Sequence, residues 1–362
     1  MIYLDYQATT PLAPEAREAM LRWLGGPGSD TFGNPHSPHR MGRMAAAAVE
    51  AAREQVAALF PPGGRVIFTS GATEALNSVL RLTSGDVLTF ATEHAAVLDC
   101  RSAVEAAGHQ FDILPVGSEG RADLGALAEA HPPHWVCAML VNNEIGTINP
   151  LSEIAQWARG EGAPVLCDAV QAYGRIPLPD CVDVYAVSAH KIHGPKGIGA
   201  LWVRDGIALD PLLLGGGQEQ GLRSGTLSPA LVAGFGTAAA LASARMEEDA
   251  AHAQALWHRA RDLFDGWTLN GSEEHRWHGN LNVRLDGLDV ARLMSDCRNV
   301  MFSAGSACAS GSGRPSHVLR AIGLSDAEAK SSIRLGFGRY TTEQDIETAA
   351  AAINAAAKEQ GL

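Results

Sequence analysis

The chain has 362 residues and is 46% hydrophobic, which is enough apolar material for a sizeable core and more than one domain. Its net charge of −12 at pH 7 argues against a nucleic-acid or anionic-membrane partner, because both bind basic surfaces. The N-terminus does not resemble a signal peptide, and the Ala-rich segment 230–244 is too short to span a membrane. We therefore expect a cytoplasmic protein whose six cysteines, which form no CxxC pair, bind no metal and remain thiols.

Strand-like apolar runs alternate with helical patterns along the first 250 residues. Strands are expected at 66–70, 87–90, 110–114, 135–141, 164–167, 182–187 and 199–203. Helices are expected between most of them, at 40–59, 71–82, 95–107, 124–130 and 151–160. This alternation predicts an α/β fold with an open and mostly parallel sheet.

The character of the chain changes after this region. A long helix is expected from residue 228 to about 264, broken only by a polar patch near Glu247. There follow a strand at 280–285, a Ser/Gly/Ala-rich stretch at 303–313, a helix near 318–322, a strand at 332–336 and a closing Ala-rich helix. We therefore assign residues 15–250 to a large α/β domain, and residues 1–14 and 251–362 to a smaller α+β domain.

Lys191 directly follows one of the predicted buried strands. A lysine at such a strand end is delivered into a cleft, where desolvation lowers its pKa and makes it a candidate nucleophile for imine formation. The Gly and Pro residues of segment 194–197 then turn the chain away. The alternative is an ordinary surface lysine in a turn.

Polar residues follow other strands of the predicted sheet, where ligands of open parallel sheets bind. Segment 70–73 could hold a phosphate at a helix start or be a simple helix cap; it lacks the GxxxxGK[ST] and GxGxxG patterns, so a cofactor phosphate fits better than a nucleotide. Asp168 could pair with a protonated pyridine nitrogen or cap a turn. His94 could cover a flat cofactor or be structural, and segment 142–144 could supply polar contacts or form a turn. Their joint occurrence favours a cofactor site around Lys191.

Cys308 and Arg334 stand out in the C-terminal region. Cys308 lies among small residues that are unsuited to a core but could bring a thiolate to a substrate and then withdraw it. Arg334 lies within an apolar strand, where an unpaired guanidinium would be costly. A carboxylate ligand held bidentately would satisfy this guanidinium, and so would an internal ion pair.

A series of motifs runs in order over nearly the whole chain: YLDYQATTP, FGNPHSPHRMG, TSGATEALN, TEHAAVLD, VNNEIGTINP, CDAVQAYG, SAHKIHGPKGIGALWV, RSGT, SAGSACASG and SSIRLGFGRYTTEQDI. With these motifs the chain resembles the cysteine desulfurases of the NifS/IscS type, within class V of the fold-type I enzymes that use pyridoxal 5′-phosphate (PLP). The resemblance implies a large PLP-binding domain with a mostly parallel seven-stranded sheet flanked by helices. It also implies a smaller α+β C-terminal domain that carries the loop with the catalytic cysteine.

The resemblance implies roles for individual residues around the cofactor. Lys191 would carry PLP, His94 would stack on the pyridine ring and take part in proton transfer, and Asp168 would pair with the pyridinium nitrogen. Gln171 would donate to the phenolic oxygen, and Asn143 would lie near both substrate and cofactor. The phosphate would be held by Ala72, Thr73, Ser188 and His190, together with Thr226 from the other subunit of a homodimer.

The reaction implied by the resemblance is the removal of sulfur from L-cysteine. Arg334 and Asn34 would bind the substrate carboxylate, and Cys308 would accept the sulfur as a persulfide while L-alanine leaves. The persulfide sulfur would pass to an acceptor protein, either an iron–sulfur scaffold or a sulfur carrier. A selenocysteine lyase, or another class V PLP lyase or aminotransferase, is the alternative, although an aminotransferase has no need of the thiol. A catalytically silent sulfur carrier is a further alternative, against which the intact Lys191 argues.

Overall fold

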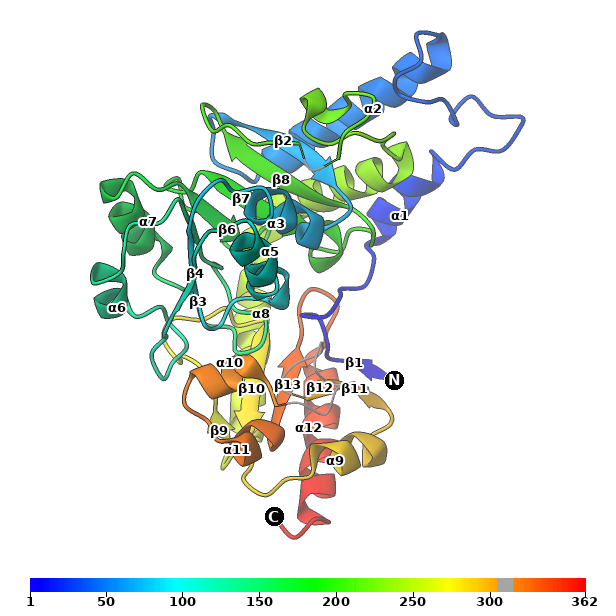
Figure 1. The fold of residues 1–362 in the computed structure, drawn as a ribbon. Coiled ribbons are helices and arrows are strands. Elements are labelled where there is room, and N and C mark those ends of the chain that lie inside the picture. Colours follow the sequence, from blue (N-terminus) through cyan, green and yellow to red (C-terminus); the bar gives the residue numbers. More distant parts are fainter. Residues whose placement is uncertain (212, 305–314) are drawn as a thin grey trace.

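The computed structural model describes residues 1–211, 213–304 and 315–362. A large body is built around a seven-stranded sheet, and a smaller body below it holds a four-stranded and a two-stranded sheet (Figure 1). Both chain ends lie in the smaller body (Figure 1). No helix in the described ranges is long and apolar enough to cross a membrane.

The seven-stranded sheet confirms the predicted open and mostly parallel α/β architecture. Six of its strands run in one direction, and only β8 runs against its neighbours β2 and β7. Every residue of β6 and β7 is buried, as expected for central strands that are covered on both faces. The strands in spatial order are β2 (Gly64–Thr69), β8 (Gly199–Arg204), β7 (Val184–Ser188), β6 (Val165–Asp168), β5 (Trp135–Cys137), β3 (Val87–Phe90) and β4 (Phe111–Leu114).

Helices cover both faces of this sheet, because successive strand residues point to opposite sides. Val66 and Phe68 of β2 belong to one apolar core, whereas Ile67 between them belongs to another. The first core includes residues of α2 and α7, and the second includes residues of α3 and α5. The helices of this part are α1 (Pro14–Leu21), α2 (Arg40–Ala57), α3 (Ala72–Leu80), α4 (Ala95–Leu98), α5 (Arg101–Ala106), α6 (Leu124–Ala128) and α7 (Leu151–Gly160).

Two elements of the large body differ from the sequence prediction by more than the one or two residues seen at other element ends. The helix predicted at 95–107 is split into α4 and α5 at Asp99 and Cys100. The strand predicted at 135–141 ends at Cys137, although the N–H groups of Ala138 and Leu140 still donate to carbonyls of β6. Apolar patterns report burial, which continues through 141, rather than the end of regular strand pairing.

The smaller body contains the strands and the closing helix expected after residue 280, together with elements that were not predicted. Its four-stranded antiparallel sheet has the order β12 (Ser303–Ala304), β13 (Ser332–Gly336), β10 (Asn280–Arg284) and β9 (Thr268–Leu269). The N-terminal strand β1 (Ile2–Tyr3) pairs in parallel with β11 (Val300–Met301). The helices are α9 (Val290–Asp296), α10 (His317–Ala321), α11 (Asp326–Lys330) and α12 (Glu343–Lys358). Strands of two residues are too short to show a periodic pattern, which is why β9, β11 and β12 were missed.

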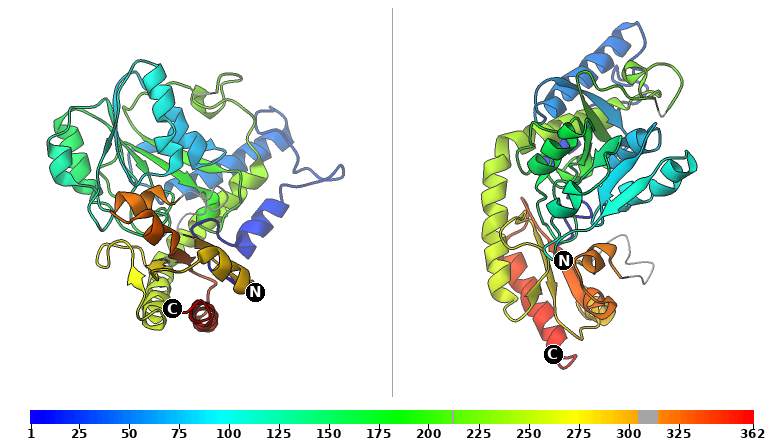
Figure 2. Two further views of the ribbon diagram at one scale, coloured as in Figure 1. Left: turned by 60° about the horizontal axis from the view of Figure 1, so that its bottom comes forward. Right: turned by 60° about the vertical axis from the view of Figure 1, so that its left-hand side comes forward.

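Helix α8 (Pro229–Leu263) connects the two bodies without a break, so the predicted interruption near Glu247 is wrong. Its first half packs into the core of the large sheet through Phe235, and its second half packs into the core of the smaller body through Leu256 and Trp257. Glu247 is exposed, so the polar patch faces solvent where the helix passes from one core to the other (Figure 2). Because one helix contributes to both cores, the domain division near residue 250 remains a prediction.

Candidate active site

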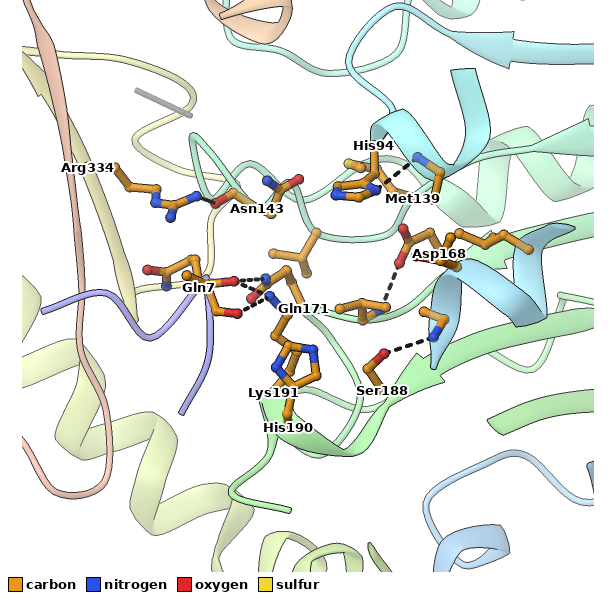
Figure 3. Close-up of a pocket in the computed structure, with 17 residues that line it drawn as sticks. Gln7, His94, Met139, Asn143, Asp168, Gln171, Ser188, His190, Lys191 and Arg334 are labelled. Atoms are coloured by element: carbon orange, nitrogen blue, oxygen red, sulfur yellow. Dashed lines mark hydrogen bonds between the residues drawn. The ribbon is translucent and has the colours of Figure 1, made fainter. Parts of the chain in front are cut away.

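A cavity of about 310 Å³ lies where the carboxyl ends of β3, β6 and β7 meet (Figure 3). Its position agrees with the general rule for ligands of open α/β sheets. The residues that line it are Gln7, Ala8, Ala72, Thr73, Leu76, His94, Ala96, Met139, Val141, Asn143, Asp168, Val170, Gln171, Ser188, His190, Lys191 and Arg334. Ten of the residues proposed from sequence are therefore brought together in one cavity.

Lys191 lines the cavity at the end of a 3-10 turn, Ala189–Lys191, that directly follows β7. Its Nζ donates to the backbone carbonyl of Gln7 and, over 2.9 Å, to that of Ala8. Burial lowers the pKa of Lys191 to about 8, and the nearby cations Arg175 and Arg334 act in the same direction. An amine with this pKa is partly neutral near physiological pH. Lys191 lines the cavity rather than an open surface turn, and its role there remains a prediction.

The first turn of α3 faces the cavity from the large-body side. The N–H of Ala72 donates to Ser188 Oγ over 2.9 Å, which joins the helix start to the end of β7. A Cβ on Gly199 would lie 2.7 Å from the Cα of Gly71, so only glycine lets β8 pack directly against this turn. A helix N-terminus with free N–H groups is a suitable environment for an anion.

Asp168 is the last residue of β6, and His94 lies four residues after the end of β3. Both side chains line the cavity (Figure 3). Asp168 Oδ1 accepts a hydrogen bond of 2.9 Å from the N–H of Val170, and His94 Nδ1 accepts one of 3.0 Å from Ala96. Both residues therefore cap turns, as the alternative interpretations proposed, and both also line the cavity. Burial raises the pKa of Asp168, while His94 and Lys191 act in the opposite direction. A cation bound in the cavity would stabilise the ionised carboxylate further.

Arg334 extends from β13 of the smaller body and is only 1% exposed. Its Nη2 forms an ion pair of 2.8 Å with Asp5, and its Nη1 donates to the carbonyl of Asn143 over 3.1 Å. This is the internal ion pair that the sequence left open as an alternative. Among the atoms that the structure describes, the buried Nε of Arg334 has no hydrogen-bond acceptor. Within the described part of the chain, this Nε–H is a donor without a partner, on a residue that lines the cavity.

Gln171 and His190 are held by contacts on either side of Lys191. Gln171 Nε2 donates to the carbonyl of Gln7 over 3.0 Å, and Gln171 Oε1 accepts from Arg175. His190 Nδ1 lies 3.2 Å from Thr9 Oγ1. Burial, followed by the charge of Lys191, lowers the pKa of His190 to about 4, so its ring is neutral at physiological pH.

Two of the residues proposed from sequence do not line this cavity. Asn34 and Thr226 are exposed, and Asn34 Oδ1 accepts a hydrogen bond from the N–H of His36. Cys308 lies outside the described residues. The nearest described strand before it is β12, in which Ser303 Oγ donates to Asp5 Oδ1 over 2.9 Å.

The sequence analysis did not identify three groups that contact Lys191: the backbone carbonyls of Gln7 and Ala8, and the guanidinium of Arg175. The carbonyls accept from Lys191, and Arg175 donates to Gln171 and to the carbonyl of Lys191. A backbone acceptor carries no sequence signature. Arg175 lies four residues after Gln171, directly after the CDAVQAYG motif, and its positive charge in a mainly apolar stretch was the only available signal.

Comparison with known proteins assigns the chain to a family. Residues 2–348 match the family model of class-V aminotransferases, so the chain belongs to this family. The predicted resemblance to NifS/IscS-type proteins within class V is confirmed by individual relatives.

Three relatives illustrate this similarity. A probable mitochondrial cysteine desulfurase of Schizosaccharomyces pombe is 42% identical over 96% of this chain and 72% of its own length. The cysteine desulfurase IscS of Rickettsia bellii is 41% identical over 96% of this chain and 89% of its own length. The solved structure of a NifS-like protein has a TM-score of 0.90 and 30% identity, and all of both chains is covered.

Proposed function

We propose that this protein is a PLP-dependent cysteine desulfurase, which converts L-cysteine to L-alanine and retains the sulfur as a persulfide on Cys308. The observation that carries the proposal is the meeting of Lys191, Asp168 and His94 in one cavity. The chain that forms this cavity is 41–42% identical to curated cysteine desulfurases. An amine, a carboxyl and an imidazole that line one cavity are the kind of cluster that active sites contain.

The residues around the cavity fit PLP. The buried carboxyl of Asp168 gains a charge partner if a protonated pyridine nitrogen binds beside it, and the neutral fraction of Lys191 is suited to bond an aldehyde. The first turn of α3, with Ala72 and Thr73, would hold the phosphate together with Ser188 and His190. When bound, PLP supplies an electron sink for the Cα–H bond of an amino acid.

The remaining cavity residues would bind and orient L-cysteine. Arg334 would direct its unpartnered Nε–H to the substrate carboxylate, while its ion pair with Asp5 and its bond to Asn143 hold the guanidinium in place. His94, at the cavity wall, would stack on the cofactor ring and take part in proton transfer. The Cys308 thiolate would take the sulfur, so that L-cysteine and a thiol give L-alanine and a persulfide with no other reactant.

A homodimer would complete the site. Thr226 is exposed and does not line the cavity of its own chain, which supports its proposed contribution to the phosphate site of a second copy. Asn34, also exposed, would contribute to the substrate carboxylate site only if a second copy or substrate binding brought it close. The sulfur acceptor would be an iron–sulfur scaffold or a sulfur-carrier protein. A cytoplasmic location is proposed, although one relative is named as mitochondrial.

The decisive experiment is incubation of the protein with L-cysteine, followed by tryptic digestion and mass spectrometry. Trypsin should release the peptide 299–320 intact, because the bond between Arg314 and Pro315 resists cleavage. Cys308 is the single cysteine of this peptide. We expect a mass increase of one sulfur atom on this peptide, with L-alanine released into solution. Cys308→Ser should abolish alanine release, and Cys181→Ser, which changes another partly exposed thiol, should leave it unchanged. Sulfide release by the Cys308→Ser variant at the wild-type rate would contradict the proposal in favour of a lyase.

A further inference from the structure

Arg175 is a cation that lies directly behind Lys191 and does not line the proposed active-site cavity. Its Nη2 donates to the carbonyl of Lys191 over 2.8 Å. Its Nη1 donates to the backbone carbonyl of Gln171 over 3.3 Å and also to Gln171 Oε1. One guanidinium thus binds both the turn that carries Lys191 and the amide that faces the cavity.

No carboxylate in the described part of the chain forms an ion pair with Arg175. Within the described ranges its hydrogen-bond acceptors are the three oxygens of Gln171 and Lys191. The guanidinium also lies 5.9 Å from the centre of the Trp277 ring. Arg175 also lines a small cavity of about 30 Å³. Asp249 is the carboxylate among the described residues that line that cavity, and it forms an ion pair of 2.6 Å with Arg339. His193 lines the same cavity, and burial lowers its pKa to about 4, so its ring adds no charge at neutral pH.

The hydrogen bonds of Arg175 determine the orientation of the Gln171 side-chain amide. Because Oε1 accepts from Arg175, the amide nitrogen must point the other way, and it donates one hydrogen to the carbonyl of Gln7 over 3.0 Å. The second amide hydrogen then remains for a ligand in the cavity. Without Arg175 the amide could turn over and present an acceptor instead.

We propose that Arg175 is a positioning residue for cofactor attachment, which fixes the Gln171 amide and, through its uncompensated charge, favours the neutral form of the Lys191 amine. The proposal rests on the proposed function, because it concerns the attachment of PLP. The charged groups that act on Lys191 are Arg175 and Arg334, which favour the neutral amine, and Asp168 and Asp5, which oppose them. Arg334 is paired with Asp5, so Arg175 is the cation whose effect is not locally cancelled.

The charge effect can be tested without cofactor or turnover. The chain has four lysines, at 191, 196, 330 and 358. Competitive acetylation of the full-length, cofactor-free protein at a series of pH values, read by mass spectrometry, reports the titration midpoint of each. We expect a midpoint near 8 for Lys191 in the wild type. In Arg175→Met it should rise by about one pH unit, because a neighbouring positive charge is lost.

Controls separate this effect from general damage. Arg175→Lys keeps the charge and should leave the midpoint near the wild-type value, and Arg292→Met on the exposed face of α9 should change nothing. The midpoint of Lys330 serves as an internal reference in every variant. If Arg175→Met does not fold, Arg175→Gln removes the same charge with a polar side chain. An unchanged Lys191 midpoint in the folded neutral variant would overturn the charge part of the proposal.

The positioning effect is read from PLP binding to the same variants. Arg175→Lys loses the planar fork that holds Gln171 and the Lys191 carbonyl, so its affinity for PLP should fall by about fivefold. Wild-type affinity in this variant would overturn the positioning part. Failure of the wild-type protein to bind PLP would instead contradict the proposed function, and the acetylation result would stand independently.

Discussion

Asp5 and Arg334 form an ion pair of 2.8 Å across the junction between the N-terminal segment and β13. Arg334 is almost completely buried, whereas the side chain of Asp5 is 20% exposed. Asp5 also accepts a hydrogen bond from Ser303, which belongs to the last described strand before Cys308. The orientation of the proposed substrate-binding guanidinium therefore depends on a carboxylate at the start of the chain.

Asp5→Asn should lower both stability and substrate affinity. The variant leaves the buried guanidinium of Arg334 without its countercharge, so we expect a loss of about 2 kcal/mol in the free energy of unfolding, measured by urea denaturation. The KM for L-cysteine should rise because the guanidinium is no longer held in place. The matched control is Asp296→Asn, which breaks the exposed pair with Arg292 and should cost less than about 0.5 kcal/mol. Equal effects of the two substitutions would contradict the structural role of Asp5.

Lys191→Ala should abolish covalent attachment of PLP. We expect the wild-type protein to be yellow and to retain the cofactor on Lys191 after borohydride reduction, as located by peptide mass spectrometry. The variant should lose the retained cofactor while its far-UV circular dichroism stays unchanged, because among the described residues the Lys191 side chain donates hydrogen bonds only to two backbone carbonyls. Lys196→Ala, five residues further along and exposed, is the control and should behave as the wild type. Cofactor retained on Lys196 in the wild type would refute this prediction.

Asp168→Asn should reduce turnover without unfolding the protein. The amide oxygen of asparagine can still accept the 2.9 Å hydrogen bond from Val170, so the turn after β6 is retained. The negative charge that would stabilise a protonated pyridine nitrogen is lost, and we expect kcat to fall on the order of 10²-fold. Steady-state alanine production checks this, with Asp180→Asn as a control for an exposed carboxylate. A melting temperature several degrees lower, accompanied by normal kcat, would identify Asp168 as purely structural.

Glu93 provides a prediction about pH. It is fully buried, its Oε1 accepts from the N–H of Met139 over 2.7 Å, and burial raises its pKa well above the usual range. An acid whose pKa is higher in the folded state stabilises the protein below its unfolded pKa, and this stabilisation is lost as pH rises through the folded pKa.

Glu93→Gln should therefore be tolerated near neutral pH and become an advantage at higher pH. Glutamine resembles the protonated acid and can keep the bond to Met139, but it cannot ionise. We expect the melting temperature of the variant, relative to the wild type, to rise steadily as the pH increases from 5 to 9, a range chosen to start about half a unit above the unfolded pKa. A difference that is constant with pH would show that the pKa of Glu93 is not raised in the folded protein.

Much of the fold could be predicted because the central strands are buried on both faces. Such strands appear in the sequence as continuous apolar runs, and the prediction for 87–90 coincides with β3. The two-residue strand β11 was missed, because it is formed by pairing with β1 across nearly 300 residues of chain and has no local signature of its own. The continuity of α8 was also missed, because its exposed middle section looks like an interruption when the two cores on either side are unknown.

The sequence by itself determined the chemistry available at the strand ends: the amine of Lys191, the carboxyl of Asp168 and the imidazole of His94. Strand ends of a parallel sheet meet at one edge, so alternation of strands and helices is enough to bring these groups together. Only the tertiary structure decided their partners and ionisation. The ion pair of Arg334 with Asp5 and the position of Arg175 behind Lys191 arise from segments whose approach depends on packing. The same packing excludes water from Lys191 and thereby lowers its pKa.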